Sequence, residues 1–248
     1  MPRLRSLFAS AGAGVLLCFA ATSVDACRQA LVLGLDVSLS VNRFDFALQR
    51  NGLADALTDE AVMQALLAGP EQPVTLAVFE WSGQFNQTLL VDWTVIDSPA
   101  TLQEIALVLR EAPQGLRSGR TGLGAAMVYA RDLLRQRPDC AVWTVDISGD
   151  GVNNNGVDPS RVRALMQAED IGVNALVIEQ PLVTPEPGTP SLSTYFAANV
   201  IVGPQAFAEV IHDFESYGAA IRRKLLRELE PVVGQAPRKT PRRLAQLP

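Results

Sequence analysis

Residues 31–40, LVLGLDVSLS, decide the fold of this chain. The first five are apolar, which is typical of a strand buried on both faces of a sheet. The run stops at Asp36, and hydroxyl groups follow at Ser38 and Ser40. Such a strand brings three oxygen-bearing side chains to one edge of a sheet, where open α/β sheets bind ligands. Taken alone, the pattern fits equally well a turn in which Asp36 caps a following helix.

Composition and charge define a single acidic domain with a basic end. The chain has 248 residues, 48% of them hydrophobic and 19% charged, which suits one globular domain. Residues 27–221 carry a net charge of −12 and residues 222–248 carry +6. An acidic body argues against a nucleic-acid partner. Residues 231–248, rich in proline and basic side chains without an acid, are predicted to be a disordered tail.

Residues 1–26 are predicted to be a signal peptide. Arg3 and Arg5 precede an apolar stretch that runs to Val24, and small residues then surround a cleavage-like position before Cys27. Two alternatives stay open, a retained membrane anchor and lipidation of Cys27. Cleavage predicts a mature protein in the bacterial periplasm or outside the cell, with no stable membrane span.

Apolar strands alternate with helical patterns along the rest of the chain. This alternation predicts an α/β fold: a three-layer, doubly wound, mainly parallel six-stranded sheet, with one antiparallel edge strand and helices on both faces. The strands are expected at 31–35, 74–79, 87–96, 141–147, 173–178 and 200–202, and the helices at 44–57, 62–67, 98–110, 121–135, 159–168, 191–198 and 205–229.

Three separated pieces carry a family resemblance. They are the Asp-x-Ser-x-Ser pattern that starts at Asp36, Thr121 before a helix, and Asp150-Gly151 after a strand. In order, spacing and context they resemble the metal-ion-dependent adhesion site of von Willebrand factor type A domains. The resemblance covers roughly residues 28–229, so the domain is expected to span 27–230. Residues 78–83, 148–151 and 220–228 further resemble secreted proteobacterial proteins of uncharacterised function that carry this domain.

The resemblance implies a metal-dependent protein-interaction module rather than an enzyme. It implies that Ser38, Ser40 and Thr121 bind the metal directly, while Asp36 and Asp150 act largely through water. Because every candidate ligand is an oxygen, a hard divalent cation is expected, Mg²⁺ first, with Mn²⁺ or Ca²⁺ as alternatives. The expected partner is a protein that offers a Glu or Asp carboxylate, and the chain itself is expected to be a monomer.

Cys27 and Cys140 are predicted to form a disulfide bond. In the implied fold, Asp36 and Asp150 end adjacent parallel strands. Cys27 lies nine residues before Asp36 and Cys140 ten before Asp150, so both cysteines begin those strands at the opposite edge. Neighbouring strands are spaced as a disulfide requires. The alternative is two free, buried thiols.

Two other functions are weighed against the binding module. The first is a metal-assisted hydrolase, for which Glu80 is the candidate general base. The second is an envelope assembly protein with a vestigial metal site. Trp81 beside Glu80 either lines a recognition surface or packs over the sheet end. Asp146 either supports the site or is a paired core carboxylate, and the second is preferred. The one histidine, His212, is expected on the last helix, so a Ser-His-Asp hydrolase is disfavoured.

Overall fold

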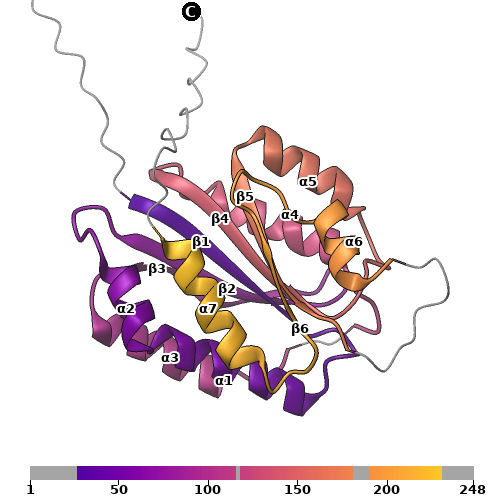
Figure 1. The fold of residues 1–248 in the computed structure, drawn as a ribbon, viewed down its shortest axis with the longest axis horizontal. Coiled ribbons are helices and arrows are strands. Elements are labelled where there is room, and N and C mark those ends of the chain that lie inside the picture. Colours follow the sequence, from indigo (N-terminus) through magenta and orange to yellow (C-terminus); the bar gives the residue numbers. More distant parts are fainter. Residues whose placement is uncertain (1–26, 116–117, 181–189, 231–248) are drawn as a thin grey trace, which may run out of the picture.

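The computed structural model describes residues 27–115, 118–180 and 190–230. It contains one six-stranded sheet in the order β3-β2-β1-β4-β5-β6 (Figure 1). All neighbouring strands are parallel except β2 and β3, which form an antiparallel hairpin at one edge. The strands are β1 (Cys27–Asp36), β2 (Val74–Trp81), β3 (Gln87–Ile96), β4 (Cys140–Gly149), β5 (Ile171–Ile178) and β6 (Ala208–Ile211).

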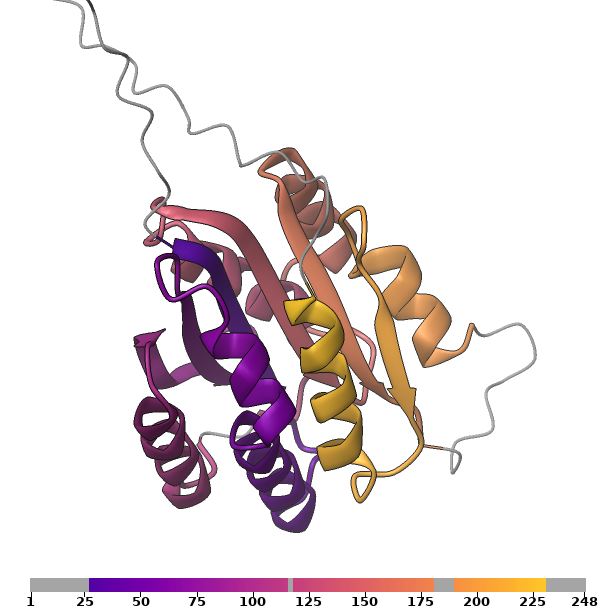
Figure 2. The same ribbon diagram turned by 60° about the vertical axis from the view of Figure 1, so that its left-hand side comes forward.

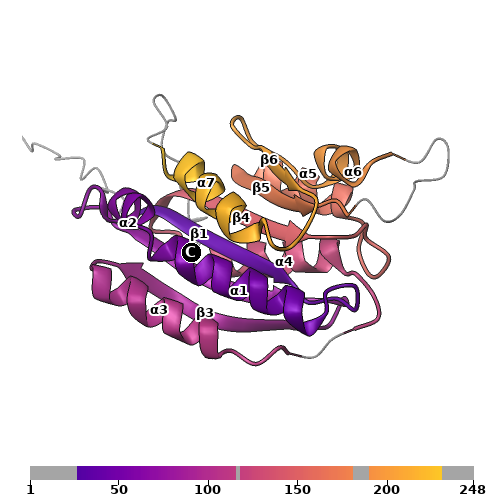
Figure 3. The ribbon, with the colours of Figure 1, turned by 60° about the horizontal axis from the view of Figure 1, so that its bottom comes forward.

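Helices cover both faces of the sheet and complete three layers (Figures 2 and 3). One face is covered by α1 (Arg43–Leu57), α2 (Glu60–Leu67), α3 (Pro99–Glu111) and α7 (Tyr217–Leu229). The other is covered by α4 (Leu123–Leu134), α5 (Pro159–Ala168) and α6 (Leu192–Asn199). The predicted fold class is therefore confirmed.

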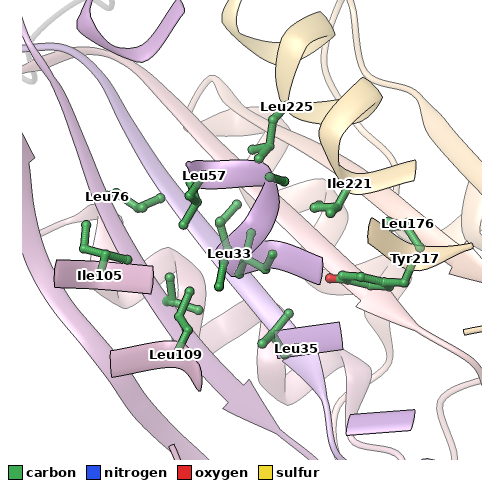
Figure 4. Packing of buried hydrophobic residues seen from close by; sticks show 14 of the residues in the cluster. Leu33, Leu35, Leu57, Leu76, Ile105, Leu109, Leu176, Tyr217, Ile221 and Leu225 are labelled. Atoms are coloured by element: carbon green, nitrogen blue, oxygen red, sulfur yellow. The ribbon is translucent and has the colours of Figure 1, made fainter. Parts of the chain in front are cut away.

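Strand β1 is the centre of the molecule, because it pairs with β2 on one side and β4 on the other. Its alternate residues serve the two hydrophobic clusters: Leu33 belongs to the one under α1 and α7, and Val32 to the one under α4. Figure 4 shows Leu33 packed in the first cluster with Leu57 and Ile221. The chain leaves β1 toward β2 and later returns on the opposite side as β4. The order of the sheet therefore reverses between β1 and β4, and the carboxyl ends of strands at such a point are where open α/β sheets bind ligands.

One glycine and one helix cap fix the local structure near these strand ends. A Cβ on Gly34 would lie 2.8 Å from the Phe79 ring, so the glycine lets β2 bring its aromatic side chains against β1. Asn42 caps α1 by accepting hydrogen bonds from the N–H groups of Phe44 and Asp45, which stops the loop after β1 and starts the helix.

The end of the domain differs from the sequence-based expectation. The expected strand at 200–202 is only an isolated bridge between Val202 and Val173, and β6 lies at Ala208–Ile211 instead. The expected helix from residue 205 begins at Tyr217. The short apolar spacing of 208–211 fits a strand as well as a helix turn, so periodicity alone misassigned it. His212 therefore lies after β6, not on a helix, with its Nδ1 3.0 Å from the Glu179 carbonyl oxygen.

The predicted disulfide between Cys27 and Cys140 is present. The two residues are direct partners in the β1–β4 register, with Cα atoms 4.3 Å apart. The predicted signal peptide (1–26) and tail (231–248) lie outside the described residues. None of the helices within the described ranges has the length and apolar character needed to cross a bilayer.

Candidate metal centre

The candidate metal centre lies where β1 ends at Asp36 and where Asp150 follows β4. The Ser38 N–H donates a hydrogen bond to Asp36 Oδ1 at 2.7 Å. The hydroxyl oxygens of Ser38 and Ser40 lie 3.1 Å apart, and the Ser40 hydroxyl donates to Asp150 Oδ1 at 2.8 Å. One chain of hydrogen bonds therefore joins four of the five residues that the sequence proposed as ligands.

The carboxylate of Asp36 is buried and only partly satisfied by hydrogen bonds. It is 0% exposed, and within the described part of the chain its Oδ2 makes no hydrogen bond of normal geometry. Burial and then the charge of Asp150 raise the pKa of Asp36 to about 7, against the hydrogen bonds from Ser38. Burial also raises the pKa of Asp150. Two crowded carboxylates beside neutral hydroxyls lack positive charge, which is the condition a divalent cation satisfies.

Thr121, the fifth proposed ligand, reaches the same place from the loop before α4. A Cβ added to Gly151 would lie 3.6 Å from Thr121 Oγ1, so the threonine hydroxyl faces the residue after Asp150. The Thr121 N–H donates to Asn154 Oδ1 at 2.8 Å, and the Asn154 N–H donates to the Thr121 carbonyl at 2.9 Å. This reciprocal pair fixes the threonine against the loop that carries Asp150.

Three consecutive asparagines organise the whole edge. The Asn153 side-chain oxygen accepts from the Gly124 N–H at the start of α4, and that of Asn155 accepts from the Gln84 N–H in the β2–β3 turn. With Asn154, they tie the loop after β4 to three other segments. From the sequence, this run is expected only to form one of the loops around the metal. Three adjacent side-chain acceptors that begin three residues after a candidate ligand were the available signal.

The support beneath Asp36 also escaped the sequence interpretation. Gln49, fully buried on α1, donates through Nε2 to the Asp36 carbonyl at 3.0 Å. A Cβ on Gly149 would lie 3.5 Å both from Asp36 Oδ2 and from the Trp81 ring. The fully buried Trp81 is thus a packing residue under the sheet end, which settles the two alternatives left open for it.

Glu80 does not face the site as a base. Its side chain is 2% exposed, and its Oε2 accepts the Gly115 N–H at 3.3 Å. Burial raises its pKa. Two residues on, the Ser82 hydroxyl accepts the Ser118 N–H at 3.1 Å and the Ser82 carbonyl accepts the Gly122 N–H at 2.6 Å. The end of β2 therefore holds the loop that leads to Thr121.

Asp146 is a paired core carboxylate, the alternative that the sequence analysis preferred. Lys224 of α7 is 0% exposed, and its Nζ lies 2.7 Å from Asp146 Oδ2. This is an ion-pair distance, although the contact is not an aligned hydrogen bond. Lys224 also pairs with Glu228, whose Oε1 accepts from Asn174 Nδ2 at 2.7 Å. The cluster holds two carboxylates for one ammonium, and burial followed by the charge of Asp146 raises the pKa of Glu228 to about 7.

The sequence also predicts that four loops, residues 80–86, 112–120, 151–158 and 179–190, ring the metal and that Arg117 and Arg120 add positive charge beside it. The turn after β2 and the loop after β4 lie at this edge, and Arg120 is exposed beside Thr121. Arg117 and residues 181–189 lie outside the described residues. Within the described ranges, no three His, Cys, Asp or Glu side chains gather as a metal-binding group. The candidate centre is of a different kind, because it combines only two carboxylates with the hydroxyl groups of three other residues.

The six-stranded sheet between two layers of helices is an α/β fold like that of von Willebrand factor type A domains. The family of this chain follows from the sequence match. The chain belongs to the family described as "Protein of unknown function (DUF1194)", which matches residues 26–233. No curated protein sequence matches the chain.

Similar solved structures share the fold. Proximal thread matrix protein 1 from the mussel byssus, in a form described as having a zinc-occupied MIDAS motif, is 18% identical with a TM-score of 0.60; the match covers 83% of this chain and 46% of that one. The pilus adhesin SpaC from Lactobacillus rhamnosus GG is 13% identical with a TM-score of 0.58, covering 84% and 31%. BatB from Bacteroides thetaiotaomicron is 12% identical with a TM-score of 0.51, covering 81% and 98%. This chain thus matches less than half the length of the first two.

Proposed function

We propose that this chain is an extracytoplasmic protein-interaction module that captures an acidic side chain of a partner protein through a divalent cation. The observation that carries the proposal is the convergence of Asp36, Asp150 and three hydroxyl-bearing residues at one edge of the sheet. The mussel matrix protein and the pilus adhesin that share the fold support an adhesion-type role.

The hydroxyls of Ser38, Ser40 and Thr121 would hold the ion directly, with Asp36 and Asp150 acting through water. Mg²⁺ is proposed first, with Mn²⁺ and Ca²⁺ as alternatives, because all donors are oxygens. Because neutral hydroxyls do not neutralise a divalent cation, the bound ion would keep positive charge that attracts a carboxylate from outside the protein. The protein contributes the fixed geometry: Ser38 orients Asp36, and Asn154 orients Thr121.

The export part of the proposal is supported by the disulfide between Cys27 and Cys140, because such bonds persist in oxidising compartments. A mature chain that starts near Cys27 would place this bond at its amino terminus. The periplasm or the extracellular space is the proposed location.

The hydrolase alternative receives no support from Glu80, because that carboxylate is buried and engaged with Gly115. If the metal site is vestigial, partner binding should not depend on metal. The pull-down described next therefore distinguishes this alternative from the proposal.

The test is an affinity pull-down from envelope extract with Mg²⁺ and again with EDTA, using wild type and Asp150→Asn. A partner retained with Mg²⁺, released by EDTA and lost with Asp150→Asn supports the proposal. Partner binding that is unchanged in EDTA contradicts it. Glu104→Ala, on the exposed surface of α3, is the control for loss of a carboxylate elsewhere.

A further inference from the structure

Exposed apolar side chains concentrate around the candidate metal centre. Within the described residues, five of the ten large hydrophobic side chains that are exposed lie near this edge, four on the loops that follow β1, β2 and β4 and one in the first turn of α1. They are Leu39 (62% exposed), Phe44 (63%), Phe85 (86%), Val152 (50%) and Val157 (39%). We call this set the apolar rim. The other five are spread over β3, α3, α5 and β6.

Hydrogen bonds between the loops hold the rim together. Leu39 lies between Ser38 and Ser40, and the bond from Ser40 to Asp150 joins its loop to the one that carries Val152. Phe85 follows Gln84, whose N–H donates to Asn155 at 2.7 Å, two residues before Val157. The rim therefore contains two flanks, Leu39 with Val152 and Phe85 with Val157, and in each a hydrogen bond joins the two loops that carry the side chains.

Leaving a side chain as large as Phe85 almost wholly in water forgoes the stabilisation that burial would give. A group of such side chains around a polar centre is typical of an interaction site.

Charge at the rim discriminates between kinds of partner. Among the described residues of this edge, Arg43 and Arg120 are opposed by Asp45 and Asp158, so the rim offers no net positive charge to an anionic lipid surface. The attraction for an anion comes from the centre alone. A partner that fits both features has one carboxylate with apolar groups on each side of it.

We infer that the apolar rim selects a protein segment in which a Glu or Asp is flanked on both sides by apolar side chains. This inference rests on the proposed function and names the partner's chemistry. The carboxylate would reach the cation, and the flanking side chains would cover Leu39 and Val152 on one flank and Phe85 and Val157 on the other.

The experiment uses three synthetic peptides of equal length on a Gly/Ser background, with binding read by fluorescence anisotropy in Mg²⁺. The first has one central Glu with a Leu on each side of it. The second replaces both Leu with Ser, and the third replaces Glu with Gln. The proteins are wild type, Phe85→Ser, Leu39→Ser and the exposed α3 control Leu107→Ser. Mn²⁺ affinity without peptide is measured for each by electron paramagnetic resonance.

Wild type and Leu107→Ser should bind the first peptide at least about tenfold more tightly than the second, because partly covering two Leu side chains gives at least the gain of covering one fully. Phe85→Ser and Leu39→Ser should each weaken that preference, because each substitution alters one flank only, while Mn²⁺ affinity stays unchanged. Equal binding of the first two peptides by wild type overturns the inference. The inference is also overturned if wild type binds phosphatidylcholine vesicles through the rim. It is likewise overturned if wild type self-associates in sedimentation and both substitutions abolish that self-association.

Failure of the proposed function gives a different result. No Mn²⁺ binding by wild type, or equal binding of the Glu and Gln peptides, contradicts the metal–carboxylate mechanism. The preference for flanking Leu would survive in that case, because it depends on the rim and not on the cation.

Discussion

The Ser40 hydroxyl donates a hydrogen bond to Asp150 Oδ1 at 2.8 Å across 110 residues of sequence. This contact joins the loop after β1 to the loop after β4, the two central strands between which the order of the sheet reverses. It therefore brings the amino-terminal and carboxyl-terminal halves of the proposed metal centre together.

Ser40→Ala should weaken Mn²⁺ binding by about tenfold or more, because it removes a proposed ligand and the contact that holds Asp150. Isothermal calorimetry measures this directly. The matched control is Ser216→Ala, since Ser216 is exposed before α7 and its side chain makes no capping hydrogen bond. An unchanged affinity in Ser40→Ala would remove this residue from the site.

Asn154→Ala should weaken Mn²⁺ binding by about tenfold and lower the free energy of unfolding by about 1–2 kcal/mol. The cause is the Thr121 N–H, which would lose its acceptor. Asn154→Asp, which keeps an acceptor oxygen, should retain more of both. The control is Asn51→Ala on the exposed face of α1. If Asn154→Ala binds metal like wild type, the position of Thr121 does not depend on its hydrogen bonds with Asn154.

The disulfide should stabilise the fold without shaping the metal centre, because Cys27 and Cys140 lie at the edge opposite Asp36. Replacing both with Ser should lower the free energy of unfolding in urea by about 2–5 kcal/mol. Mn²⁺ affinity should stay unchanged below the unfolding transition. A double variant with wild-type stability would show that the bond contributes nothing.

Glu228 should make the protein less stable as pH rises from mildly acidic to neutral. Its folded-state pKa of about 7 exceeds the ordinary value of 4.5, so the folded state holds a proton that the unfolded state has released. This contribution to the free energy of unfolding is present below pH 4.5 and is lost as pH rises through 7, an effect of about 1–3 kcal/mol.

Urea unfolding of wild type and Glu228→Gln between pH 4.5 and 8, with EDTA present, measures this effect. Because Gln imitates the protonated acid, the variant should gain stability relative to wild type as pH rises. Parallel pH profiles for the two proteins would refute the assignment. The difference between the proteins isolates Glu228 from Asp36, whose raised pKa acts in the same direction.

Apolar runs in the sequence were sufficient for five of the six strands. The adjacency of β1 and β4 followed from the family resemblance, and with that adjacency the spacing of Cys and Asp was sufficient for the disulfide. The sequence was insufficient for Lys224, which stands among arginines and resembles a surface residue until α7 is placed on the sheet. It also misassigned residues 205–216, where short apolar spacing fits a strand and a helix equally well. The ties made by the asparagine run depend on which loops meet, and that follows only from the assembled fold.

Asp36 offers the most direct test of the central claim, that this edge binds a divalent cation. Asp36→Ala should remain folded, because two crowded carboxylates without a cation repel each other. Calorimetry with Mg²⁺ and Mn²⁺ should show saturable binding by wild type and by Glu104→Ala, and none by Asp36→Ala. Equal affinity in wild type and Asp36→Ala, or no binding by wild type, would contradict the account.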